Sequence, residues 1–296
     1  MSRIAGLFRP DGTRPDDRAT LQRMLDALPG SRLTALSSSA CAIGRTTELQ
    51  GTIRGDIGQS DELLIALDGC IINAAELRHA LPDASPGDAC LIGALYRKHG
   101  FEGSLVRMAG NFAVALYDPA TRGLWLGRDR LGVKPLYWAR TEGGIAFASQ
   151  PRGLLAGGGV SSAVNRTFVA RFAASHYRTF DNLPEESPYA AINQLPAGHY
   201  VDFGRGGDPR PRAYWALRDL AEWEESADVL AEHYRDTLIT AVGRHVSASD
   251  RPAFTLSGGL DSSSVLCCAA TVTGRKQYAV SSVYADATYD ERDEIQ

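Results

Sequence analysis

The chain has 296 residues and a formal net charge of −4, from 31 Lys and Arg against 35 Asp and Glu. A hydrophobic fraction of 44% and a charged fraction of 22% are typical of a folded globular protein. The length is typical of a chain with about two domains. The negative balance disfavours a nucleic-acid partner, five cysteines are too few for a disulfide framework, and the run of about 18 apolar residues that a membrane span needs is absent. The opening residues lack the apolar segment of a secretory signal, so we expect a cytoplasmic protein without a membrane partner.

Hydrophobic periodicity predicts short strands and helices in the first hundred residues. They are expected, in chain order, as strand 4–8, helix 18–28, strand 63–67, strand 70–72, helix 75–81 and helix 89–99. Asp68-Gly69, between the second and third strands, is typical of a two-residue hairpin turn. Gly100 is expected to end the last helix, because glycine is frequent just after a helix.

Further strands follow closely, at 111–117, 123–128, 135–140 and 144–149. Many strands with few helices predict an antiparallel sheet layered with helices. The charged run Arg128-Asp129-Arg130, with Lys134, is expected to be structural. A Gly- and Pro-rich stretch then indicates a linker. The domains are predicted at 1–205 and 226–296, with the linker at 206–225.

The segment PAFTLSGGLDSSSVLCCAAT, from Pro252 to Thr271, carries the strongest signal for chemistry. An apolar strand at 253–256 leads into SGGLDSS, and a helix follows. Adjacent glycines let the backbone approach an anion, and the N–H groups at the start of a helix bind phosphate. Asp261 would repel a phosphate, so a bridging divalent cation is the simplest account. The spacing matches neither a Walker A loop nor a Rossmann loop, and the alternative is a Gly- and Ser-rich turn with an Asp cap.

SGGLDSS resembles the pyrophosphate-binding loop of the ATP-pyrophosphatase enzymes, and within them that of the asparagine synthetase family. Three earlier segments resemble the same family, in the same order: AGNFAVALYDPATRGLWLGRDRLGVKPLYW from Ala109, GGIAFASQPRGLL from Gly143 and INQLPAGHYVDF from Ile192. Because the resemblance spans almost the whole chain, the chain is identified as a member of this family.

The resemblance implies an α+β N-terminal domain with the αββα sandwich of Ntn hydrolases, of the glutamine amidotransferase kind. The start of an α/β ATP-pyrophosphatase domain with a parallel sheet follows. That domain uses ATP and Mg²⁺ to activate a carboxylate as an acyl-adenylate, which an amine attacks. Asp261 is assigned to Mg²⁺. The ATP contacts are assigned to Leu256, Ser257, Gly258, Gly259, Asp261, Ser262, Ser263 and Ser282.

The glutaminase residues depart from the family pattern. The family nucleophile is a cysteine exposed by removal of the initiator methionine, and Ser2, with a far less acidic hydroxyl, stands there. Asp68 replaces the oxyanion-hole asparagine and would repel the oxyanion. The R-G-P-D segment, whose arginine the resemblance assigns to the glutamine carboxylate, has no counterpart between residues 30 and 44. Gly69 and Asp88 still match the glutamine pocket, but we predict that the site is inactive.

Without ammonia from glutamine, we expect the attacking amine to belong to the substrate. The N-terminal segment and the tail VSSVYADATYDERDEIQ look most like the lasso-peptide macrolactam synthetases of the family. They imply a precursor peptide as the carboxylate substrate, with a homodimer or a maturation partner left open. Two alternatives remain: an asparagine synthetase that uses glutamine or ammonia, and a non-catalytic scaffold.

The second domain is expected to be incomplete. A doubly wound sheet needs about five strands, and the residues after the linker predict two, at 253–256 and 278–284. The 296 residues are therefore expected to hold one complete domain and the first piece of another, and to turn nothing over alone.

Overall fold

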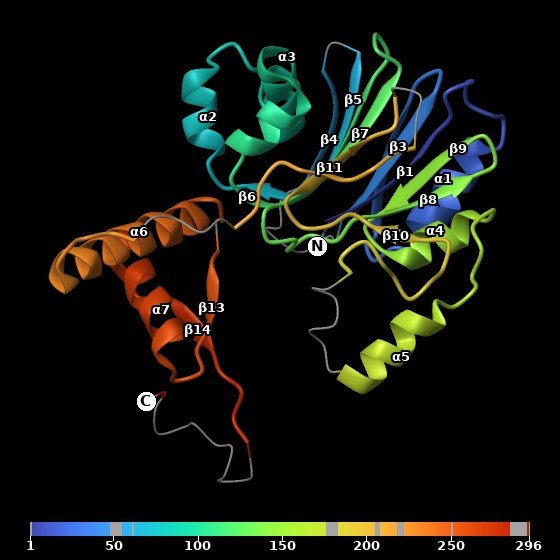
Figure 1. Ribbon diagram of the computed structural model, residues 1–296. Helices are drawn as coiled ribbons and strands as arrows, with labels where there is room; N and C mark the ends of the chain where they lie inside the picture. Colours follow the sequence, from blue (N-terminus) through green and yellow to red (C-terminus); the bar gives the residue numbers. More distant parts are fainter. Residues whose placement is uncertain are drawn as a thin grey trace. The chain divides into compact units, whose positions relative to one another are not determined.

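The computed structural model describes residues 2–47, 55–60, 62–175, 183–204, 208–217, 222–249, 251–284 and 295. The chain forms two units, Met1–Leu217 and Arg218–Gln296 (Figure 1). This boundary falls inside the predicted linker at 206–225. Part of that linker belongs to the first unit, however, because Arg212–Ala213 forms strand β12 and pairs with β11. Residues 285–294 of the tail lie outside the described residues.

Two antiparallel sheets of six strands each form the centre of the first unit. The first sheet has the order β10–β8–β9–β1–β3–β2. Its strands are β1 Ser2–Phe8, β2 Arg32–Ser37, β3 Cys41–Thr47, β8 Tyr137–Thr141, β9 Gly144–Ala148 and β10 Asn193–Gln194. The second sheet has the order β12–β11–β7–β6–β5–β4. Its other strands are β4 Asp56–Ser60, β5 Leu63–Ile71, β6 Gly110–Asp118, β7 Gly123–Arg128 and β11 His199–Asp202.

The helices of the first unit are α1 Asp17–Asp26, α2 Ala74–Ala80, α3 Asp88–Arg107, α4 Pro151–Gly157 and α5 Arg166–Ser175. The first four lie on the outer sides of the two sheets, whereas α5 extends away from them (Figure 1). The apolar stripe of α1, with that of α4, packs on the first sheet, and α3 packs on the second. The space between the sheets is filled by buried apolar residues of both. These layers make the predicted αββα sandwich.

Buried aromatic residues join the sheets at the centre of the sandwich. Phe8 on β1 and Tyr117 on β6 lie 5.9 Å apart, between their ring centroids, and both are almost completely buried. Burying a side chain of this size stabilises a fold by about 1.5–3 kcal/mol. This layer therefore fixes the position of β1, which carries Ser2, against the second sheet.

The hairpin predicted at Asp68-Gly69 is wrong, because residues Leu63–Ile71 form one continuous strand, β5. β5 pairs with β6 through Gly69, which lies opposite Phe112. Gly69 has a φ of 114°, and a Cβ there would lie 1.9 Å from the carbonyl oxygen of Asn111. Glycine is therefore required here for a close approach of two strands rather than for a turn.

The helix predicted to end at Gly100 is instead interrupted there. Gly100 has non-helical angles, φ 70° and ψ 178°, but the helix resumes and ends at Arg107. The first part of this helix, α3, begins at Asp88 and so places that carboxylate at its N-terminus.

The second unit contains a β–α–β arrangement. Its elements are α6 Ala227–Ser247, β13 Ala253–Thr255, α7 Leu260–Thr273 and β14 Tyr278–Val280. β13 and β14 are parallel neighbours, as expected for the start of a parallel-sheet domain, although both are shorter than predicted. Ser226 caps α6, its hydroxyl accepting the N–H of Val229 at 3.4 Å.

None of the helices within the described residues combines the length and the apolar character that a bilayer crossing requires.

Candidate functional site

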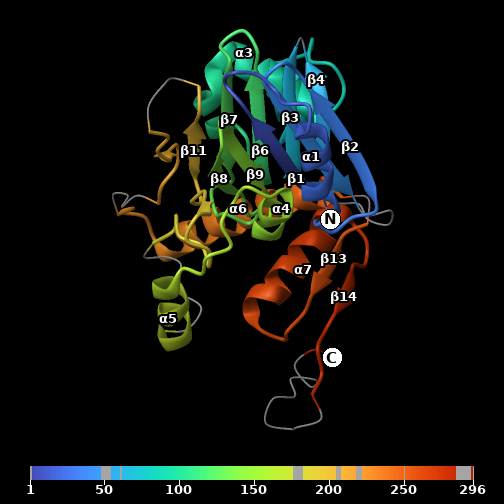
Figure 2. The same cartoon turned by 90° about the vertical axis from the view of Figure 1, so that its right-hand side faces the viewer.

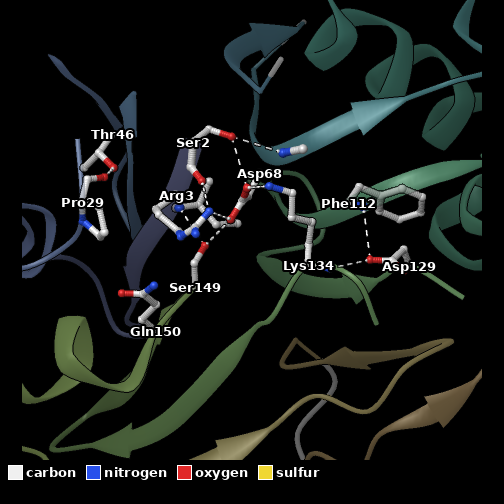
Figure 3. A network of polar contacts seen from close by, with 12 residues as sticks. Ser2, Arg3, Pro29, Thr46, Asp68, Phe112, Asp129, Lys134, Ser149 and Gln150 are labelled. Carbon is white, nitrogen blue, oxygen red and sulfur yellow. Dashed lines mark hydrogen bonds and ion pairs between the residues drawn. The ribbon is translucent and has the colours of Figure 1, made fainter. Parts of the chain in front are cut away.

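The first unit brings Ser2 and Gly69 together from different sheets. Ser2 begins β1 of the first sheet, whereas Asp68 and Gly69 lie in β5 of the second. The N–H of Gly69 donates to Ser2 Oγ at 3.2 Å, and Ser2 Oγ donates to Asp68 Oδ1 at 3.2 Å. Ser2 and Asp68 are both completely buried. The nucleophile position and the oxyanion position of the predicted site are therefore in direct contact (Figure 3).

Asp68 lies at the centre of a charged network (Figure 3). Lys134 Nζ lies 3.0 Å from Asp68 Oδ1, and a terminal guanidinium nitrogen of Arg3 lies 3.7 Å from Asp68 Oδ2. The hydroxyl of Ser149 donates to Asp68 Oδ2 at 2.8 Å and accepts the N–H of Ile4 at 2.9 Å. A buried carboxylate is tolerated when it is paired and hydrogen-bonded, and Asp68 is both.

Asp129 holds the loop that delivers Lys134. Its buried carboxylate accepts the backbone N–H groups of Phe112, Leu131, Val133 and Lys134, at 3.2, 3.2, 3.0 and 2.9 Å. Arg128 closes the same loop by donating to the carbonyls of Gly132, Lys134 and Leu195. Burial lowers the pKa of the Arg128 guanidinium, and Asp129 raises it. The charged run is thus structural as predicted, but its last member, Lys134, enters the site.

Asp88 lies in a pocket beside Ser2 rather than in the network. The pocket has a volume of about 750 Å³ and is lined by Gly55, Asp56, Arg78 and Asp88, among others. Gly55 connects it to the network, because a Cβ at Gly55 would lie 2.4 Å from Ser2 Oγ. Asp88 Oδ1 lies 3.4 Å from the Arg78 guanidinium, and Asp56 accepts the N–H of Ala89 at 2.9 Å.

Arg45 is a further cation that the sequence did not single out. It lies on β3, outside residues 30–44 where the R-G-P-D arginine was sought, and donates to the carbonyl of Gly55. Burial lowers the pKa of the Arg45 guanidinium, Arg32 lowers it further, and Asp56 and Asp68 raise it. Arg45 therefore interacts electrostatically both with Asp56, which lines the pocket, and with the buried carboxylate of Asp68.

This arrangement is a poor oxyanion site. Amide hydrolysis places negative charge on the carbonyl oxygen, which needs hydrogen-bond donors. Asp68 offers only acceptors, and the one backbone donor beside it, Gly69 N–H, is directed at Ser2 Oγ. Lys134 and Arg3 compensate the charge of Asp68. The carboxylate of Asp68 is thus occupied by its neighbours, whereas the buried Nε atoms of Arg3 and Arg45 have no hydrogen-bond partner among the described residues.

In the second unit, the predicted phosphate-binding residues form a compact loop before α7. Gly259 is the N-cap of α7, and Gly258 has a φ of 80°. Ser257 and Ser262 bind each other, Oγ to Oγ at 3.2 Å, and the N–H of Ser257 donates to Ser262 Oγ at 3.2 Å. Ser263 lies in the first turn of α7. The loop therefore presents exposed hydroxyls and backbone donors at a helix N-terminus, which suits a phosphate group.

Asp261 could hold a magnesium ion only together with a ligand. It is exposed in the first turn of α7, and among the described residues no group of three His, Cys, Asp or Glu side chains gathers to hold a metal ion. Mg²⁺ usually binds one or two carboxylates plus substrate phosphates and water, so a single Asp fits this chemistry. Leu256 donates its N–H to Val280 O at 3.1 Å, and Ser282 lies beyond β14 and is exposed.

Arg3, Lys134 and Ser149 are the members of the network that sequence reasoning missed. Arg3 follows the nucleophile position directly, and Ser149 lies in the family-like segment GGIAFASQPRGLL. Neither position indicates the contact with Asp68, which is 81 residues from Ser149 in sequence.

Comparison with known families agrees with this division of the chain. A model described as a glutamine amidotransferase domain matches residues 56–215, and one described as asparagine synthase matches residues 233–296. Asparagine synthetase [glutamine-hydrolyzing] 2 of Bacillus subtilis is 27% identical over 71% of this chain and 29% of its own length. A putative asparagine synthetase of Mycobacterium bovis is 31% identical over 71% of this chain and 33% of its own length. The chain thus spans about a third of the length of these relatives.

Two solved structures are similar to this chain. The allosteric regulatory enzyme of purine biosynthesis has a TM-score of 0.50 at 14% identity, covering 99% of this chain and 68% of that one. The glutamine PRPP amidotransferase of B. subtilis has a TM-score of 0.47 at 14% identity, covering 98% and 68%.

Proposed function

The chain belongs to the glutamine amidotransferase family, of the asparagine synthetase type, and we propose that its first unit does not hydrolyse glutamine. One observation carries the proposal: Asp68, which the family resemblance aligns with the oxyanion-hole asparagine, is completely buried and in contact with Ser2. Attack by Ser2 Oγ would build negative charge beside this carboxylate, and the repulsion raises the barrier.

The groups around Asp68 support this proposal. Ser2 Oγ is itself the donor to Asp68, at 3.2 Å, so the hydroxyl is held by the carboxylate in the ground state. Lys134 and Arg3 are both paired to the same carboxylate. Ser2, Gly69 and Asp88 are then remnants of a glutaminase, and the network joins the two sheets.

For the second unit we propose ATP-dependent amide-bond formation. The substrate carboxylate attacks ATP, pyrophosphate leaves, and an amine displaces AMP from the resulting acyl-adenylate. Bound Mg²⁺ supplies positive charge that offsets the leaving pyrophosphate. Asp261 holds the metal, and the loop donors orient the phosphates. The proposed ATP contacts are Leu256, Ser257, Gly258, Gly259, Asp261, Ser262, Ser263 and Ser282.

The amine follows from the proposed loss of glutaminase activity. Since the first unit supplies no ammonia, the amine belongs to the substrate, and a precursor peptide closing on its own Asp or Glu side chain gives a macrolactam. A second candidate function is that of an asparagine synthetase, which the names of the relatives favour. A third candidate is a scaffold without catalytic activity.

Calorimetric titration with ATP tests the second unit. We expect ATP to bind in the presence of Mg²⁺ and binding to be lost in Asp261→Asn. The control is Asp228→Asn, which changes an acidic residue in the first turn of α6 and should bind ATP as the wild type does. Absence of binding with and without Mg²⁺ contradicts the proposal and favours the scaffold. The 296 residues are expected to turn nothing over alone, so turnover assays need a chain in which the second domain is complete. There, pyrophosphate release that depends on a precursor peptide supports the macrolactam, and release with aspartate and ammonia supports the asparagine synthetase.

A further inference from the structure

Strand β2 forms an open margin of the first sheet. It is the terminal strand, paired on one side with β3, and no other strand of the described chain pairs with its outer side. Five of its six residues, Arg32–Ser37, are exposed. Figure 2 shows β2 at the side of the sandwich, next to β3. An unpaired strand edge is a template for another strand.

The register fixes which backbone groups of β2 point outward. The N–H of Ser38 donates to Cys41 O at 2.8 Å, in register with the β2–β3 pairing. Hydrogen-bonded pairs alternate along antiparallel strands, so Leu33, Ala35 and Ser37 direct their N–H and C=O groups away from β3. After Arg32 the strand contains neither a charged residue nor proline, which are the usual protection of an edge.

A groove runs beside this edge, between β2 and the start of α1. It has a volume of about 370 Å³, and its walls include Ala35 and Ser37 of β2. Ser38 also lines it, and its hydroxyl oxygen is buried without a hydrogen-bond partner in the described part of the chain. Strand-addition sites use backbone pairing for affinity and such pockets for alternate side chains.

The exposed charge of the groove is positive and comes from Arg18, which lines it and is exposed. Arg14 also lines the groove, but its guanidinium lies 3.7 Å from the carboxylate of Glu142. Asp17 also lines it but is buried and satisfied, with an oxygen 2.7 Å from Arg9 Nε and another accepting the N–H of Arg14 at 2.7 Å. Carboxylate side chains are therefore the complementary ligands.

We infer that the edge of β2 binds an extended peptide with acidic side chains, which adds a strand to the first sheet. Every second side chain of that peptide lies over the groove, where a carboxylate meets Arg18. The charge favours an acidic peptide over a second copy of this chain. A second copy paired through the same edge would bring its own Arg18 toward this groove, and like charges would oppose the contact.

Fluorescence anisotropy with the 296-residue chain tests this inference. The probe is a fluorescein-labelled eight-residue peptide of alternating valine and glutamate, compared with a lysine version and with one N-methylated at alternate residues. We expect binding of the glutamate peptide that weakens as salt is added, and about tenfold weaker binding of the other two.

Two pairs of variants separate backbone from charge. Ala35→Pro removes an outward N–H and is expected to abolish binding, whereas Ala35→Val keeps it. Arg18→Glu is expected to weaken binding about fivefold, whereas Arg152→Glu, an exposed arginine on α4, leaves it unchanged.

Three results would overturn the inference. Equal binding of the glutamate and lysine peptides removes the role of charge, and binding unaffected by N-methylation or by Ala35→Pro removes the role of the strand edge. Self-association of the wild type in sedimentation, lost in Ala35→Pro, assigns the edge to a second copy instead. Arg18→Glu keeps the test decisive should Ala35→Pro fail to fold.

Discussion

Replacing Asp68 by asparagine restores the residue that the family carries and tests how the buried network is balanced. The substitution removes a carboxylate that faces Lys134 Nζ at 3.0 Å and the guanidinium of Arg3 at 3.7 Å. Breaking a buried ion pair from one side costs about 3–5 kcal/mol. The side chains of Lys134 and Arg3 retain 13% and 12% exposure, so water relieves part of the cost. We therefore expect the free energy of unfolding to fall by about 3 kcal/mol.

Urea denaturation of the wild type and Asp68→Asn, followed by far-UV circular dichroism, measures this loss. For a unit of 217 residues, a loss of that size lowers Tm by about 6–12 °C. Adding Lys134→Met to Asp68→Asn removes one of the two cations that faced the lost carboxylate and should recover part of the loss, whereas Lys134→Met alone destabilises. A change below about 0.5 kcal/mol in Asp68→Asn, or additive effects of the two substitutions, would refute the reasoning.

Three other substitutions have expected outcomes. Gly69→Ala should prevent folding or cost more than about 3 kcal/mol by denaturation, because its Cβ would overlap the carbonyl oxygen of Asn111; a mild effect would contradict the close approach. Asp129→Asn should cost about 2 kcal/mol, since one oxygen that accepts N–H groups becomes a donor, and unchanged urea midpoints would contradict this. Burial and the hydrogen bond to Asp118 raise the pKa of Tyr96 to about 12. The stability that this phenol contributes is complete below pH 10 and is lost as pH rises toward 12, so Tyr96→Phe should lessen that loss by about 1 kcal/mol after solvent screening; parallel pH profiles would contradict it.

The strands of the sandwich core could be predicted because burial leaves a pattern in the sequence. Residues 111–117 are apolar nearly throughout, and they form the centre of β6. β2 lacks such a pattern, since Arg32–Ser37 is exposed on both faces and owes its strand structure to pairing with β3. The hairpin turn predicted at Asp68-Gly69 was wrong for a related reason. Its turn preference is local, whereas the positive φ of Gly69 serves a contact with Asn111, 42 residues away in sequence.

The candidate site was predictable only where motifs mark it. The segment around Gly69 and the N-terminal position of Ser2 resemble family motifs, so their meeting across 67 residues could be expected. The pairing of Asp68 with Lys134 and Arg3 depends on how a loop held by Asp129 reaches over β5, and local sequence does not encode that approach. The replacement of a neutral donor by Asp68 was visible in the sequence, but the cations that make it tolerable were not.

Glutamate release from glutamine by the purified 296-residue chain is the most direct test of the central claim that Asp68 has ended the glutaminase activity. The matched control is Ser2→Ala, which removes the hydroxyl at the nucleophile position. We expect no glutamate above the level of the Ser2→Ala variant, with or without ATP. Turnover by the wild type that Ser2→Ala abolishes would contradict it.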